Sequence, residues 1–66
     1  MHGVEKGAKF KVGDKVRMPY GAFLVGTVSE VRVSPTQAGL VFYRVRVPMD
    51  PEPLWMEVRE DEIEKA

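Results

Sequence analysis

The chain of 66 residues contains no cysteine and only one histidine, His2. Without cysteine there is no disulfide framework and no thiolate metal site. Nucleophilic and acid–base catalysis need a reactive residue and a partner that tunes it, and the single histidine lies apart from the rest of the pattern, in an N-terminal arm. We therefore expect no catalytic residue, no metal site and no enzymatic activity.

Glycine-rich ligand loops are missing as well, because Gly13-Asp14 and Gly21-Ala22 are typical of turns and not of phosphate or dinucleotide loops. The acidic residues near the C-terminus have no repeated ligand spacing and are typical of a solvated turn. No apolar run approaches the length that spans a bilayer. These absences predict no cofactor and no membrane partner, and the lack of cysteine fits the cytoplasm.

The length of the chain predicts one small domain of marginal stability. At this size only about 60% of the unfolded surface is buried on folding. Small domains without disulfides or metals often gain further burial by self-association. We therefore expect a protein partner, and a second copy of the chain is the first choice.

Charge is balanced overall but not along the chain. Ten basic and ten acidic residues give a net charge of zero. Residues 1–34 contain six Lys or Arg and three acids, a charge of +3, whereas residues 35–66 contain four and seven, a charge of −3. A dedicated nucleic-acid-binding protein usually has a basic balance. The net charge of zero counts against nucleic-acid binding but does not exclude it.

Apolar and charged residues alternate along most of the chain, as they do in half-buried strands. Residues 1–9 lack this pattern and predict a flexible N-terminal arm, so that the domain occupies residues 10–66. The predicted strands are 10–18, with a turn at Gly13-Asp14, then 23–33, 40–47 and 54–58.

The apolar positions change parity within the second of these strands. Val28 and Val31 cannot share a face of a regular strand, so we predict a bulge or sharp bend at Ser29-Glu30. Gly26 is a second position where the backbone is expected to approach a neighbour closely.

Segments rich in proline and glycine, 34–39 and 48–53, predict loops. Glu60-Asp61-Glu62 fit one helical turn, after which Ile63 returns to the core. Short strands, tight turns and the need to protect sheet edges together predict an all-β protein, a single five-stranded SH3-like barrel with a short helical turn before the last strand.

Four aromatic residues are not assigned to the core by parity: Tyr20, Phe23, Phe42 and Trp55. Small barrels bind peptides or modified side chains through aromatic residues on neighbouring loops, so Tyr20, Phe23 and Trp55 are candidates for a cage or groove. Covering a barrel end or filling a subunit interface is the alternative. Glu57, beside Trp55 on the same strand face, is included in this predicted site.

Basic residues project from the predicted outer faces of the first and third strands. A phosphate-binding stripe is one interpretation of Lys15, Arg17, Arg44 and Arg46. The ordinary charged outside of a barrel is the other, since lysine also discourages edge pairing.

Several short motifs resemble bacterial SH3-like barrels. These are Val12-Gly13-Asp14-Lys15-Val16-Arg17 at the first strand, Gly26-Thr27-Val28, Tyr43 to Val47, and Glu60 to Glu64 near the end. The resemblance as a whole covers residues 8–64. The resemblance implies the fold, and it leaves the function open because many functions share such barrels.

A narrower resemblance is to the type II, trimethoprim-insensitive dihydrofolate reductases, small barrels that form tetramers around a central pore. Lys9-Phe10, Gly13-Asp14, Val16-Arg17, Gly21-Ala22, Gly26 and Ile63-Glu64 are similar to the framework of that family. Met18 takes the place of the pore lysine, and Trp55-Met56-Glu57-Val58 take the place of the family's Val-Gln-Ile-Tyr stretch. The resemblance therefore implies a shared framework without the catalytic residues.

Three hypotheses follow. The first is a non-catalytic SH3-like barrel that acts as a binding or assembly module and self-associates. The second is a nucleic-acid-associated barrel similar to KOW or Tudor-like modules. The third is a small-molecule-binding or reductase-like oligomer, with Trp55, Met56 and Glu57 lining a pore.

Overall fold

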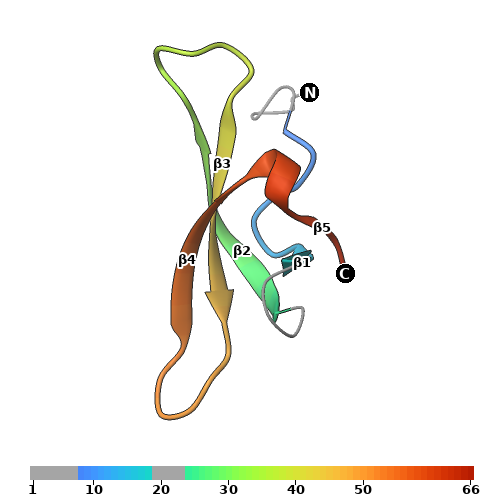
Figure 1. Ribbon diagram of the computed structural model, residues 1–66, viewed down its shortest axis with the longest axis vertical. Helices are drawn as coiled ribbons and strands as arrows, with labels where there is room; N and C mark the ends of the chain where they lie inside the picture. The colour runs from blue at the N-terminus through green and yellow to red at the C-terminus, as the bar shows by residue number, and fades with distance from the viewer. Residues whose placement is uncertain (1–7, 19–23) are drawn as a thin grey trace.

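The fold is described from a computed structural model for residues 8–18 and 24–66 (Figure 1). Its elements are β1 (Lys15–Met18), β2 (Leu24–Val33), β3 (Val41–Val47), β4 (Leu54–Arg59), a 3₁₀ turn η1 (Glu60–Glu62) and β5 (Glu64–Lys65). The strands form one antiparallel sheet in the order β4-β3-β2-β1-β5. The prediction of an all-β chain with a helical turn before its last strand is confirmed.

The core lies on one face of this sheet, and β3 supplies the largest part of it. Val41, Tyr43, Val45 and Val47 are at most 4% exposed, while Phe42, Arg44 and Arg46 point to the opposite face. Val, Ile, Tyr and Phe favour strands because they fit a half-buried pleated surface. Around β3 the core is completed by Val16, Met18, Val28, Val58 and Ile63. Ile63 therefore returns to the core as predicted.

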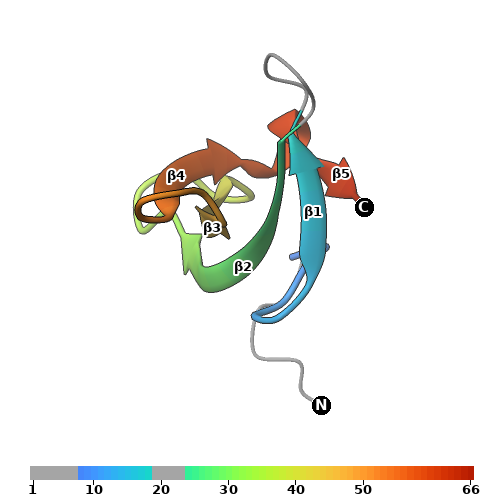
Figure 2. The same ribbon diagram turned by 90° about the horizontal axis from the view of Figure 1, so that it is seen from below.

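A bulge in β2 joins two parts of the sheet that face different directions. The pairing of β2 with β3 shifts register between Val28 and Glu30, as the change of apolar parity predicts. The hydroxyl of the intervening Ser29 donates to the carbonyl of Arg44 over 3.2 Å. Figure 2 shows the result, a strongly curved β2 that connects β3 and β4 on one side with β1 and β5 on the other.

Gly26 lies on the inner side of this curve, and the backbone approaches its neighbouring strand closely there, as predicted. A Cβ atom at this position would lie 2.5 Å from Val45 Cγ1 and 2.8 Å from the carbonyl oxygen of Arg46. Real Cβ atoms do not approach other atoms so closely, so only glycine lets β2 pass this near to β3.

The first strand is shorter than predicted. Residues 10–14 are not in a strand, and residues 11–14 form a turn that contains the predicted Gly13-Asp14 turn: the amide of Asp14 donates to the carbonyl of Lys11 over 3.0 Å, and Gly13 has a φ of +98°. The Asp14 carboxylate accepts the Lys11 amide, which lowers the pKa of Asp14, and the side-chain ion pair with Lys11 adds to this. The turn breaks the two-residue period, so Val12 is 61% exposed and does not share the face of Val16.

Tyr43 connects the two ends of the described chain. Its hydroxyl donates to the Glu60 carboxylate over 2.6 Å and accepts the amides of Lys9 and Phe10, each over 3.2 Å. The ring of Phe10 packs edge-on against it with 5.5 Å between centroids. Burial, with the bond to Glu60, raises the pKa of Tyr43 to about 12. Lys9 lies in the predicted arm, and its amide also donates to Glu60 over 2.8 Å.

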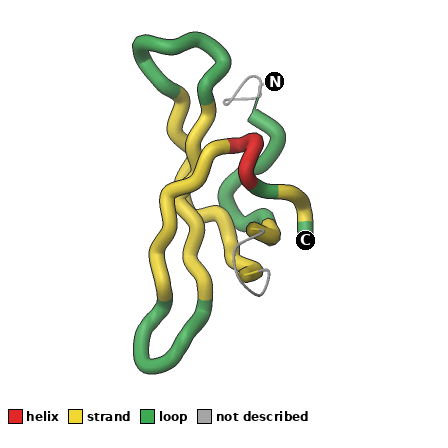
Figure 3. Tube along the Cα trace, in the orientation of Figure 1, coloured by secondary structure: helices red, strands yellow, loops and turns green. Residues whose placement is uncertain are grey.

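The two proline-containing connections lie at opposite ends of the long strands (Figure 3). Segments 34–39 and 48–53 contain neither helix nor strand, which confirms both predicted loops. Leu54, at the end of β4 next to the second loop, pairs with Val47 on the core face but remains 39% exposed. The core therefore thins out toward this end of the sheet.

Candidate binding surface

The side of β2, β3 and β4 opposite the core is called the outer face here. The register of the three strands arranges its side chains in cross-strand rows, in which directly opposite residues on neighbouring strands lie about 5 Å apart. The rows are Thr27, Arg46 and Trp55; Glu30, Arg44 and Glu57; and Arg32, Phe42 and Arg59.

Arg32 bridges the two glutamates of the middle row across β3. Its Nε lies 3.2 Å from Glu30 Oε2, and its Nη1 lies 3.2 Å from Glu57 Oε2. The hydrogen bond to Glu30 and the charges of both carboxylates raise the pKa of Arg32. All three side chains are about half exposed, so the network contributes little to stability and mainly determines where charge lies on the face.

Arg44 takes a different partner. It lies in register between Glu30 and Glu57, but its guanidinium stacks over the ring of Trp55 with 4.9 Å from Cζ to the ring centroid. Trp55 nevertheless stays 47% exposed. Arg46 lies directly opposite Trp55 on β3. The indole is therefore flanked by two arginines, one stacked on it and one beside it.

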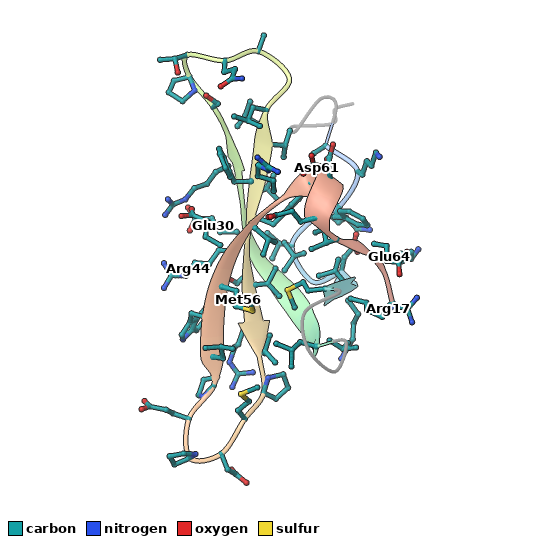
Figure 4. The ribbon with its side chains drawn as sticks, viewed as in Figure 1. Arg17, Glu30, Arg44, Met56, Asp61 and Glu64 are labelled. Carbon is teal, nitrogen blue, oxygen red and sulfur yellow. The ribbon has the colours of Figure 1, made fainter. Side chains whose placement is uncertain are left out.

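The basic residues of the predicted stripe divide into two groups. Arg17 pairs with Glu64 of β5 over 3.1 Å, and Figure 4 shows this pair on the opposite side of the molecule from Glu30 and Arg44. Lys15 lies across Thr27 from Arg46, so it extends the row that contains Trp55. Within residues 8–18 and 24–66, none of Lys15, Arg44 and Arg46 forms a salt bridge.

Two shallow hollows indent the outer face, and they share Arg32 and Glu57. One of about 110 Å³ adjoins the stacked pair and is lined by Arg32, Arg44, Trp55, Met56 and Glu57. The other, of about 260 Å³, is lined by Arg32, Val33, Ser34, Pro35, Phe42 and Glu57. Both are open depressions in the surface, and neither is an enclosed cavity.

Three of the five residues predicted for ligand or partner binding come together here. Phe42, Trp55 and Glu57 all lie on the outer face, in three different rows. Tyr20 and Phe23 lie outside the described residues, so the cage with Trp55 stays a prediction. Glu30 and Arg32 belong to the surface but were not predicted. Their place follows from the parity change at the bulge, combined with a cross-strand register that alternation within one strand does not reveal.

The outer face combines exposed charged side chains with an aromatic ring. Its carboxylates are exposed and paired with Arg32, and no histidine or cysteine lies among the described residues. In the same part of the chain, no group of three or more His, Cys, Asp or Glu is placed to hold a metal ion. No helix within residues 8–18 and 24–66 is long and apolar enough to cross a membrane.

The chain matches no protein-family model, no curated protein and no solved structure. Its function is therefore inferred from its own residues.

Proposed function

We propose that the protein is a non-catalytic SH3-like barrel that acts as a binding module through its outer face. The strand order supports the barrel: β5 pairs with β1, β2 curls between the two halves of the sheet, and η1 comes just before β5. Closure into a barrel would protect edges that so small an open sheet leaves exposed.

The exposed indole of Trp55 is the observation that supports binding most strongly. Tryptophan is a large apolar side chain that usually gains stability by burial, and aromatic residues left at the surface are enriched at interfaces. Here the ring is 47% exposed on a sheet face, stacked with an arginine and next to a shallow hollow. Arginine and tryptophan are also the residue types that dominate binding energy in known interfaces.

Self-association is part of this proposal, and the end of β4 supports it. Among the described strands, β4 is an edge of the sheet and has only β3 as a neighbour. Leu54 and Met49, both near this edge, are 39% and 44% exposed. An edge strand with apolar neighbours favours pairing with another chain.

Amide-resolved NMR tests the proposal without assuming the partner. The labelled protein is diluted stepwise, and it is titrated separately with a single-stranded oligonucleotide, an acidic peptide and a proline-rich peptide. We expect at least one of these series to shift outer-face amides of β3 and β4, and we expect Trp55→Ala to remove the shifts. Val12→Ala, which shortens an exposed apolar side chain outside the outer face, is the matched control and should bind as the wild type does.

The proposal is wrong if neither dilution nor any probe shifts the amides of β3 and β4. It is also wrong if the shifts occur but Trp55→Ala and Val12→Ala leave them equally unchanged. In that case a different surface of the protein binds the partner.

A further inference from the structure

We propose that the Trp55 patch, defined as Trp55, Arg44, Arg46 and Lys15, binds single-stranded nucleic acid. A base stacks on the indole, and the three basic side chains contact phosphates of the same strand. This inference rests on the proposed function, because it names the partner of the same outer face.

The charge of the patch differs from the charge of the whole protein. Five carboxylates of the described residues have partners that do not belong to the patch: Asp14 has Lys11, Glu60 has Tyr43, Asp61 has Arg59, Glu62 has the Arg59 amide and Glu64 has Arg17. Glu30 and Glu57 lie near the patch but share Arg32. On the strands around Trp55, the residues Arg44, Arg46 and Lys15 carry three positive charges and the Glu30–Arg32–Glu57 network carries a net −1, which leaves an excess of +2. Asp50 and Glu52 lie in the loop 48–53 that leads into β4, outside these strands. A cationic surface of this kind attracts phosphate.

The spacing of the basic side chains suits a linear polyanion. Arg44 and Arg46 are two residues apart on β3, which places their Cα atoms about 7 Å apart. Lys15 lies two strands away from Arg46 in the same row, about 10 Å across the sheet. The charges thus follow a bent path over the sheet surface, with Trp55 next to Arg46, and a flexible single strand can follow such a path.

The stacked arginine serves both parts of the ligand. The guanidinium of Arg44 lies over the Trp55 ring, with 4.9 Å from Cζ to the centroid, and an arginine in a cation–π contact still has N–H groups to donate to a phosphate. Arg44 forms no salt bridge with any described residue, although Glu30 and Glu57 are its direct cross-strand neighbours. Stacked aromatic residues combined with a cationic track are the usual means by which proteins hold single strands.

Other partners fit the patch less well. In a duplex the bases are stacked on one another, so the indole would lose its contact. An acidic peptide would use the basic side chains but would present no regular series of flat rings. A second copy that packed patch against patch would bring like charges together, which is unfavourable in a two-fold interface.

Trp55 is the only tryptophan in the chain, so its fluorescence reports on this site directly. The full-length protein is titrated with an unlabelled mixed-sequence oligonucleotide of about 12 nucleotides, a length within the range of known single-strand sites. RNA, DNA, duplex and abasic versions of the same length are compared. We expect RNA and DNA single strands to quench Trp55, the duplex to bind more weakly, and the abasic strand to bind without the same quenching.

Salt dependence and substitutions test the two kinds of contact separately. Three phosphate contacts predict a slope of about −2 for log K against log salt, because each contact on a single strand contributes about −0.7. Arg46→Gln should reduce the slope by about 0.7. Arg17→Gln removes the same formal charge from a residue paired with Glu64, so as the matched control it should leave the slope nearly unchanged.

Replacing the indole tests the stacking contact. Trp55→Ala should weaken binding about 5- to 150-fold, and Trp55→Phe should restore much of the affinity, because stacking needs a flat ring. These two variants lack the intrinsic signal, so a fluorescent label on the oligonucleotide measures their affinity, and circular dichroism confirms that they are folded.

The inference is overturned if single strands with and without bases bind equally, or if Arg17→Gln and Arg46→Gln lower the slope alike. It is also overturned if no oligonucleotide binds at low salt. Shifts of β3 and β4 amides by a peptide or by dilution would then show that the proposed binding module stands and that only its partner was wrong. If no probe gives a response, both this inference and the proposed binding function are wrong.

Discussion

Tyr43 on β3 and Trp55 on β4 are two large aromatic residues on neighbouring strands, and they face opposite sides of the sheet. Tyr43 is fully buried, and its hydroxyl has one acceptor and two donors around it. Trp55 is 47% exposed, with the guanidinium of Arg44 stacked on its ring. A polar aromatic whose contacts are satisfied stabilises the fold, whereas one left open beside basic side chains is available to a ligand. We therefore propose separate roles for the two sides of the sheet, which substitutions can test.

The largest loss of stability is expected on the core side, from Gly26→Ala. The added methyl would press on Val45 and on the backbone carbonyl of Arg46, and a backbone atom in a paired strand cannot move aside easily. Overpacking of this kind costs about 1–3 kcal/mol of unfolding free energy. Val25→Ala is the matched control, because Val25 is the neighbouring residue and is 43% exposed. Urea denaturation that gives equal midpoints for both variants would contradict this.

Tyr43→Phe should follow, with a loss of about 1–3 kcal/mol, because Glu60 loses a donor and the amides of Lys9 and Phe10 lose an acceptor. The loss should depend on pH. The pKa of Tyr43 is raised from 10.0 to about 12 on folding, so the neutral phenol stabilises the folded state. That contribution is complete below pH 10 and disappears as the pH rises toward about 12.

The variant itself is the control for this pH dependence, because every other titrating group is common to both proteins. Urea denaturation across this alkaline range should therefore bring the wild type down toward Tyr43→Phe. A difference between the two that stays constant with pH would show that the hydroxyl is not held as described.

A smaller effect on stability, about 0–1 kcal/mol, is expected from Arg32→Gln, because its ion pairs with Glu30 and Glu57 are exposed. Its effect on binding should be larger than that on stability. Two carboxylates would lose their partner next to Arg44 and would compete for that guanidinium or repel a phosphate. Oligonucleotide affinity measured at low salt should fall, and an unchanged affinity would mean that Arg32 does not control the charge of the outer face.

The smallest effect on stability, within about 0.5 kcal/mol, is expected from Trp55→Ala. The side chain lies outside the core and the surface around it is open. Thermal and urea denaturation measure this directly. A loss of more than about 1 kcal/mol would place Trp55 among the residues that hold the fold and would remove the contrast with Tyr43.

Alternation within single strands made much of the fold predictable. The core positions of β3, the loops at both ends of it and the turn at Glu60–Glu62 follow from local patterns of apolar, charged and breaker residues. The bulge near Ser29 was also predictable, because apolar residues can change faces within one strand only where the backbone takes in an extra residue or bends. Val12 was misplaced, since the Lys11–Asp14 turn stops the alternation before the strand begins.

The arrangement of the outer face depended on contacts between distant segments. Arg32 meets Glu57 across 25 residues of sequence, and the hydroxyl of Tyr43 meets the amide of Lys9 across 34. Such contacts depend on strand register and on curvature, which one strand's pattern does not specify. The aromatic and basic residues of the surface could be named from the sequence. The sequence did not show which of the basic residues form salt bridges.

The bulge at Ser29 changes which residues of β2 face the core, because side chains in a strand alternate between its two faces like a frame with a period of two. Upstream of it even-numbered residues face the core, and downstream odd-numbered ones do, so one extra residue shifts the frame for the rest of the strand. Deleting Ser29 would restore a single frame. It would leave Glu30 and Arg32 on the outer face and Val31 and Val33 on the core face, because Val28 and Glu30 would then be consecutive residues of a regular strand, and it would remove the bulge. Ser29 is therefore the position in β2 where a single deletion keeps the alternation of faces, whereas a single insertion or deletion elsewhere in the strand would reverse the faces of the residues that follow.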